Sequence, residues 1–236
     1  MRPRVALFDI DGTLLHAGGA GRRALEAAME EHLGGVVRPQ EAWLTGMKLD
    51  GMTDRLIVRE AILAVGHRFD EELCARILES YAEHLQVQID GPGYRVLPGV
   101  EALLAALAAR RAVFGLCTGN ILRGARIKLE RGGLARWFGF GPGDVYGFAE
   151  DAEARERIVE AALRRAAARL GAALDPRDVL VVGDTPRDVT AAQACGCPVL
   201  AVATGRYDVE ALRAEGADVV VPTLEHPAAR SLLLGA

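Results

Sequence analysis

Two carboxylates, Asp9 and Asp11, stand at the end of a short apolar run in VALFDIDGTLL, residues 5–15. Carboxylates are rarely buried unless a partner compensates their charge. Two that lie so close repel each other unless a cation or a shared proton intervenes. One carboxylate of such a pair can act as a nucleophile, while the other donates and accepts protons. The pair therefore predicts a reactive site that also holds a cation.

Polar residues also follow two later apolar runs. AVFGLC is followed by TGN (118–120), and VLVVG leads into GDTPRD (183–188). In an open α/β sheet, ligands bind just beyond the carboxyl ends of the strands. Carboxylates with few other ligands suit Mg²⁺, which favours phosphate oxygens. We therefore expect a magnesium ion and a phosphoryl group in a crevice formed by Asp9, Asp11, Thr118, Asp184 and Asp188.

Apolar runs rich in β-branched residues alternate with helical patterns over most of the chain. Near-continuous apolarity is typical of strands that are buried on both faces. Strand–helix alternation predicts an α/β fold with a doubly wound parallel sheet. The predicted strands are 5–8, 112–117, 144–148, 179–183, 198–203 and 218–221, and the predicted helices are 100–110, 121–133, 154–170, 187–195 and 208–215.

Residues 16–96 do not follow this alternation. Helical patterns cover 21–33, 53–65 and 70–86, with no convincing strand among them. Crossovers in parallel sheets are usually much shorter. We therefore expect a helical domain inserted after the first strand, with hinges near 15–18 and 91–96, and a core made of 1–15 and 97–236. The alternative is that these helices cover one face of the sheet.

The composition is that of a soluble globular protein. The 236 residues are half hydrophobic and one quarter charged, and the net charge is −4. No basic run indicates a nucleic-acid partner, and no apolar stretch is long enough to cross a membrane. The N-terminal residues do not resemble a signal peptide, so we expect a cytoplasmic protein. The four cysteines form no C-x-x-C pair and are expected to be free thiols. The sequence leaves monomer and homodimer open.

The motifs DIDGT, TGN and GDTPRD, in this order, resemble those of the haloacid dehalogenase (HAD) superfamily of phosphotransferases. The resemblance covers essentially the whole chain. It implies a Rossmann-like core with a helical cap between the first and second motifs, which is where residues 16–96 lie.

The resemblance also implies roles for single residues. Asp9 would be the nucleophile and a Mg²⁺ ligand. Asp11 would be the general acid and base, with its backbone carbonyl on the metal, and its presence argues against carbon–halogen chemistry. Thr118, with the backbone N–H groups of Gly119 and Asn120 after it, would bind phosphate; Asp184 would ligate Mg²⁺, and Asp188 would ligate the metal or hold its waters.

The third motif of the family, usually a lysine at a helix start, has no clear counterpart here. The segment FAEDAEARERIVEAAL contains no lysine. Arg155, at the start of a helical pattern, is our candidate for the basic residue that contacts the phosphoryl group. Arg157 is the close alternative, and Lys128 on the preceding helix is a rival. Each would otherwise be a solvated helix residue.

The segment LDGMTD, residues 49–54, resembles the G-x-T-D stretch in the caps of phosphoglycolate-phosphatase-like members. The resemblance implies that Thr53 and Asp54 contact the substrate. The alternative is that one of them caps the helix that follows.

These observations predict a Mg²⁺-dependent phosphatase that acts on a small phosphorylated metabolite through an aspartyl-phosphate intermediate. An enclosing cap favours small substrates because it must close over them to exclude water. The main alternative is a phosphomutase on the same scaffold. A catalytically silent module would lack one of the motif acids, and phosphonate hydrolysis would require a cap lysine, for which Lys48 is the sole candidate.

Overall fold

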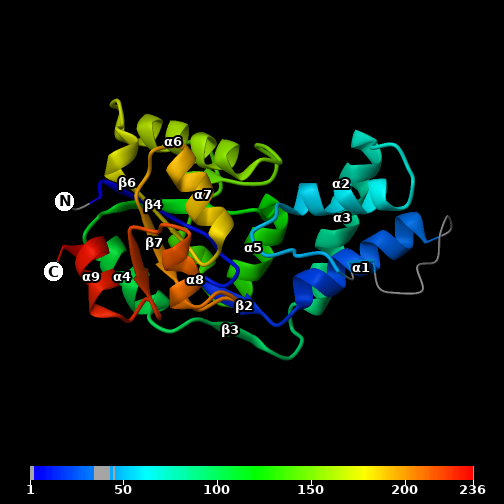
Figure 1. The fold of residues 1–236 in the computed structure, drawn as a ribbon, viewed down its shortest axis with the longest axis horizontal. Coiled ribbons are helices and arrows are strands. Elements are labelled where there is room, and N and C mark those ends of the chain that lie inside the picture. Colours follow the sequence, from blue (N-terminus) through cyan, green and yellow to red (C-terminus); the bar gives the residue numbers. More distant parts are fainter. Residues whose placement is uncertain (1–2, 35–42, 45, 236) are drawn as a thin grey trace.

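The computed structural model describes residues 3–34, 43–44 and 46–235, and its core is a six-stranded parallel sheet (Figure 1). The strands lie in the order β5-β4-β1-β6-β7-β8, so the first strand is central and pairs in parallel with β4 and β6. The predicted doubly wound α/β fold is confirmed. The strands are β1 (Val5–Phe8), β4 (Val113–Cys117), β5 (Tyr146–Gly147), β6 (Val179–Gly183), β7 (Val199–Val202) and β8 (Val219–Val221).

Helices cover both faces of the sheet, and the side chains of β1 show why this strand is apolar throughout. Ala6 and Phe8 belong to one buried cluster, whereas Val5 and Leu7 belong to another on the opposite face. The first cluster includes α4 (Val100–Ala109), α5 (Leu122–Arg131) and α9 (Pro227–Leu234); the second includes α6 (Arg155–Leu170), α7 (Pro186–Ala194) and α8 (Val209–Ala214). Two 3₁₀ turns, η1 (Ala135–Trp137) and η2 (Pro176–Asp178), complete this part of the chain.

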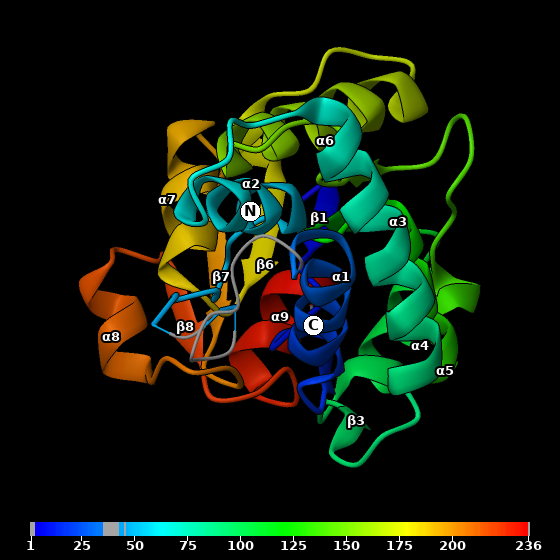
Figure 2. The same ribbon diagram turned by 90° about the vertical axis from the view of Figure 1, so that its right-hand side faces the viewer.

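Three helices between the first and second strands of this sheet pack on one another. They are α1 (Ala20–Leu33), α2 (Asp54–Ala64) and α3 (Glu71–Gln88), and a separate cluster of apolar side chains joins them. They stand at the end of the molecule opposite the two chain termini, and α1, α2 and α3 face the viewer in Figure 2. We keep the word cap for residues 16–96 and the word core for 1–15 and 97–236, as an interpretation of this arrangement.

Two short strands that the sequence analysis missed lie at the predicted hinges. β2 (Leu15–Ala17) and β3 (Tyr94–Val96) pair antiparallel, with Leu15 opposite Val96. Three residues are too few to show a strand period, and the pairing joins positions far apart in sequence. The cap is therefore connected to the core through a small two-stranded sheet.

Within the described residues, no helix combines the length and the apolar character that crossing a membrane requires.

Candidate active site

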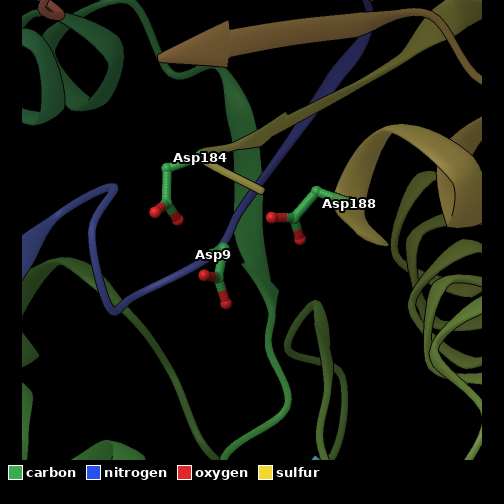
Figure 3. A group of neighbouring side chains, drawn as sticks. All are labelled: Asp9, Asp184 and Asp188. Carbon is green, nitrogen blue, oxygen red and sulfur yellow. The ribbon is translucent and has the colours of Figure 1, made fainter. Parts of the chain in front are cut away.

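Three adjacent strands deliver polar side chains to one point of the structure. Asp9 follows β1, Thr118 follows β4 and Asp184 follows β6, and the order β4-β1-β6 makes the three strand ends neighbours. Asp188 joins them from the first turn of α7. Carboxylate oxygens of Asp9, Asp184 and Asp188 lie within 4.8 Å of one another, around a common space that Figure 3 shows.

The electrostatics of this cluster fit a divalent cation. Burial raises the pKa of Asp9 to about 6, although Arg155 opposes the shift and Asp188 adds to it. Burial, with the neighbouring charges of Asp188 and Asp9, also raises the pKa of Asp184 well above its ordinary value. Hard carboxylate oxygens that lie close together are the donors that Mg²⁺ accepts.

Asp188 differs from its two neighbours because both of its oxygens already have partners. Oδ2 accepts hydrogen bonds from the backbone N–H of Thr185, at 3.0 Å, and from the Thr185 hydroxyl, at 2.7 Å. The Thr185 hydroxyl in turn accepts the Asp188 N–H, which completes a capping box at the start of α7. Oδ1 accepts from the guanidinium of Arg155. This carboxylate therefore anchors Arg155 and α7 as well as facing the cluster.

Asp184 sits where two glycines leave room for it. Gly12 has a φ of +82°, and a side chain at Gly12 or at Gly205 would run into the Asp184 carboxylate. The Thr13 hydroxyl donates to Asp184 Oδ1 at 3.3 Å. The DGT part of the first motif thus orients Asp184 as well as supplying Asp11.

The second acid of the first motif has its own surroundings. The Asp11 side chain is 43 % exposed and faces a cavity, and its Oδ2 lies 2.6 Å from Lys128 Nζ. The Asn120 amide donates to the same oxygen at 2.8 Å and to the Thr118 hydroxyl at 2.8 Å. Asn120, predicted for its backbone N–H alone, therefore links Asp11 to Thr118 through its side chain.

The candidate cations occupy different places. Arg155 is 9 % exposed; its guanidinium lies 3.0 Å from Asp9 Oδ1 and bonds Asp188. Lys128 is 4 % exposed and contacts Asp11 and Asn120. Burial lowers the pKa of Lys128, but Asp11 and Asp54 outweigh that effect and raise it, so the ammonium stays charged. Arg155 and Lys128, expected as rivals for one role, both belong to the site. Arg157 is exposed and pairs with Glu160, so it takes no part.

The two cap residues predicted to contact substrate also have different surroundings. Thr53 is the N-cap of α2: its hydroxyl accepts the Leu56 N–H at 3.2 Å and donates to the backbone carbonyl of Glu153. It lies outside the lining of the main cavity. Asp54 lines that cavity and accepts the backbone N–H of Ile121 at 2.9 Å. Burial raises the pKa of Asp54 to about 7, although Lys128 opposes the shift.

Most of these groups line a cavity of about 610 Å³ between cap and core, namely Asp9, Asp11, Asp54, Thr118, Asn120, Lys128, Arg155 and Asp184. The sequence analysis did not identify several polar residues on its walls. Most of them occupy helix faces, short strands or loops without a motif, whereas Thr185 and Asp50 lie inside quoted segments but were given no role. Tyr81, in particular, shares one face of α3 with the apolar residues Ile77 and Leu85, so the sequence pattern gives no sign of a polar role for it. The polar lining residues missed in this way are His16, Arg22, Asp50, Tyr81, Arg95, Thr185 and Arg206.

Comparisons with known proteins agree with this geometry. Residues 3–196 match the family model described as haloacid dehalogenase-like hydrolase. A phosphoglycolate phosphatase of Rhodospirillum rubrum is 34 % identical over 91 % of this chain and 85 % of its own. An N-acetylmuramic acid 6-phosphate phosphatase of Pseudomonas aeruginosa is 28 % identical, with coverage of 96 % and 92 %.

A solved structure shows the same fold. CbbY from Rhodobacter sphaeroides, in complex with phosphate, superposes with a TM-score of 0.71 at 17 % identity, over 99 % of this chain and 98 % of the other. The three strand ends that meet at Asp9, Thr118 and Asp184, together with the family match and the curated relatives, lead to one conclusion. The chain belongs to the haloacid dehalogenase-like hydrolase family and is an enzyme of its phosphatase type.

Proposed function

We propose that this protein is a Mg²⁺-dependent phosphatase that hydrolyses a small phosphorylated metabolite through an aspartyl-phosphate formed on Asp9. The observation that carries the proposal is the position of Asp9. It lies beside Asp184 in a cluster of buried acids, and the Arg155 guanidinium lies 3.0 Å from its Oδ1.

The metal held by the acid cluster, together with the guanidinium of Arg155, would balance the negative charge of the phosphoryl group. Asp9, Asp184 and the backbone carbonyl of Asp11 would hold Mg²⁺, which would supply positive charge to the phosphoryl oxygens. Arg155 fixes the Asp9 carboxylate and presents a planar set of N–H donors beside it. Attack by Asp9 on phosphorus then splits hydrolysis into two easier steps.

The groups around Thr118 would hold the other phosphoryl oxygens. The Thr118 hydroxyl is fully buried next to Asp9, which it also stabilises as a hydrogen-bond donor. At Gly119 a side chain would collide with the backbone carbonyl of Met52 and with Arg155, so the backbone at this position stays close to the site. Its N–H and that of Asn120 follow the strand end as phosphate donors.

Asp11 would serve the proton transfers. Its carboxylate faces the cavity, where the leaving group of the ester must lie, and Lys128 and Asn120 hold its orientation. In the protonated form it would give a proton to the leaving oxygen, and it would then take one from the water that attacks the phosphoenzyme.

The substrate is a metabolite-sized phosphate ester. The two curated relatives named above carry different substrates in their names, one a phosphorylated two-carbon acid and the other a sugar acid phosphate. A cavity of about 610 Å³ has room for either.

The proposal is tested with purified protein stripped of metal by EDTA. Phosphate release from p-nitrophenyl phosphate should be lost and should return when Mg²⁺ is added. Acid-quenched protein should carry a phosphoryl group on the peptide that contains Asp9, and Asp9→Asn should not. Full activity in metal-free buffer, or a phosphopeptide elsewhere, would contradict the mechanism. Isomerisation of a sugar phosphate without release of phosphate would point to the mutase.

A further inference from the structure

One wall of the cavity takes part in the proposed phosphoryl transfer only through the contact of Lys128 with Asp11. It consists of Tyr81 on α3, Lys128 on α5 and Asp54 at the start of α2, and we call it the leaving-group wall. Tyr81 is fully buried, and its hydroxyl makes no hydrogen bond of ordinary length and angle with the part of the chain that the structure describes, although the Asp54 carboxylate lies close enough to interact with it. Asp54 and Asp11 are near enough to raise the pKa of Tyr81, together with burial. A buried hydroxyl without a partner is uncommon and points to a ligand.

The Tyr81 hydroxyl and the Lys128 ammonium face the same gap. A Cβ built on Gly21 would lie 3.5 Å from Lys128 Nζ and 3.8 Å from the Tyr81 hydroxyl. Because residue 21 is a glycine, it places no side chain against these two polar groups, and all three residues line the cavity. Lys128 Nζ also lies 2.6 Å from Asp11 Oδ2. The gap therefore adjoins the acid that would protonate the leaving oxygen.

The charges on the leaving-group wall determine what it can bind. Asp11 already neutralises Lys128, and Asp54 is a second carboxylate close to the same ammonium. When Asp54 is ionised, as it is above about pH 7, these three groups carry no net positive charge, whether or not Asp11 is protonated. A carboxylate on the leaving group would find no surplus positive charge here, whereas a neutral hydroxyl could both donate to a carboxylate and accept from Tyr81.

We propose that Tyr81, Lys128 and Asp54 form a leaving-group subsite that selects phosphate esters of polyhydroxylated alcohols, namely sugars and polyols, over those of small hydroxy acids. The proposal rests on the phosphatase function given above. Three arginines besides Arg155 also line the cavity, namely Arg22, Arg95 and Arg206. Arg22 pairs with Glu26 at 3.1 Å, and Arg206 pairs with Asp50 at 3.3 Å.

The first test compares substrates on the wild-type enzyme with Mg²⁺. Glucose 6-phosphate and glycerol 3-phosphate represent hydroxylated leaving groups, and 2-phosphoglycolate represents the carboxylate class. We expect kcat/KM to be at least tenfold higher for the better of the first two. A preference for 2-phosphoglycolate would overturn the subsite while leaving the phosphatase function intact. No phosphate release from any ester, p-nitrophenyl phosphate included, would overturn the phosphatase function and the subsite with it.

The second test removes one oxygen atom. Tyr81→Phe should raise KM for the preferred hydroxylated ester by about five- to tenfold, the usual effect of one hydrogen bond, and should change KM for 2-phosphoglycolate much less. Its thermal midpoint without substrate should not fall, because the hydroxyl has no partner to lose. Tyr146→Phe is the matched control: it removes the same atom from β5, outside the cavity lining, and should alter no KM. Unchanged KM values in Tyr81→Phe, or equal losses on both substrates, would refute the subsite.

A third variant fills the gap instead of removing a partner. Gly21→Leu places a larger side chain between Tyr81 and Lys128 at a helical position that leucine favours over glycine. The folded protein should remain stable, and kcat/KM should fall at least tenfold more for glucose 6-phosphate than for p-nitrophenyl phosphate. Equal effects on these two esters would mean that leaving groups do not enter this space.

Discussion

A single residue, Ile10, separates Asp9 from Asp11, yet the two acids lie in different environments. Asp9 is buried against Arg155 and two other acids, whereas Asp11 reaches into the cavity toward Lys128 and Asn120. Two chemically identical carboxylates can play opposite roles when their surroundings differ in this way.

Replacing each acid separates these roles. Asp9→Asn should abolish turnover of every ester, because the nucleophile is lost. Asp11→Asn keeps the nucleophile and should slow alkyl phosphates by about 10²- to 10⁴-fold, the usual contribution of a general acid. Its effect on p-nitrophenyl phosphate should be much smaller, since nitrophenolate leaves without a proton. Steady-state rates on the two ester types decide the matter, and equal losses with Asp11→Asn would count against a general acid.

We propose that Arg155 takes the place of the missing third-motif lysine, because it contacts both Asp9 and Asp188 from the first residue of α6. Arg155→Ala should lower kcat/KM by about 10²-fold or more, comparable to the loss of one strong transition-state contact. Arg155→Lys should recover part of the activity, because the charge returns without the planar fork. Arg157→Ala is the matched control: this arginine lies two residues further along the same helix, is exposed, and its variant should behave as wild type. A near-normal Arg155→Ala enzyme would exclude this role.

At the scale of elements, the start of α2 joins cap to core through backbone groups. Asp54 donates its N–H to the carbonyl of Gly119, at 2.7 Å, and its carboxylate accepts the N–H of Ile121. The cap helix is thereby fixed to the loop that carries Thr118. A carboxylate buried at such a junction makes the stability of the protein depend on pH.

Asp54 should make the folded state less stable as pH rises. Its pKa is about 7 in the folded protein and 3.8 when unfolded, so the folded state binds a proton more tightly than the unfolded state. The stabilising effect is complete below about pH 4 and is lost as pH rises through about 7, with up to about 4 kcal/mol at stake. Denaturant titrations at pH 5 and pH 8 should show a smaller difference for Asp54→Asn than for wild type. Asp175 is an exposed acid whose pKa is lowered to about 2, so Asp175→Asn should leave the stability difference between pH 5 and pH 8 unchanged. If Asp54→Asn also leaves that difference unchanged, Asp54 is not the source of the pH dependence.

At the scale of the whole molecule, charged side chains hold cap and core together at the surface. Glu153, in the core, lies 3.3 Å from Arg55 and 2.8 Å from Arg59, which both belong to α2. Each exposed pair stabilises the contact between cap and core by only about 0.2–1 kcal/mol. We propose that the cap opens to admit substrate, and a contribution of this size is enough to shift the equilibrium between its closed and open positions.

Glu153→Gln should therefore loosen α2 without unfolding the core. Hydrogen exchange of the peptide over residues 53–64 should become about two- to fivefold faster, as expected for the loss of about 0.5–1 kcal/mol, while exchange in β1 and β6 stays the same. Glu160→Gln removes a pair that lies within α6 and should change neither region. If the two variants exchange alike, these ion pairs do not restrain the cap.

The sequence by itself determined the sheet and the acids that gather at the ends of its strands. Strands buried on both faces carry continuous apolar runs, and motif residues follow those runs directly, so Asp9, Thr118 and Asp184 could be placed at strand ends before any coordinates were known. Helices such as α6 were predicted to within a residue, because their apolar period is long enough to detect.

The tertiary structure alone decided which side chains meet across distant segments. Arg155 reaches Asp188, 33 residues on, and Lys128 reaches Asp11, 117 residues back; local pattern carries no information about such pairs. The β2–β3 pairing joins Leu15 to Val96 for the same reason. Tyr81 belonged to an apolar helix face in the sequence, and only the packing of α3 against α5 placed its hydroxyl at the edge of the cavity.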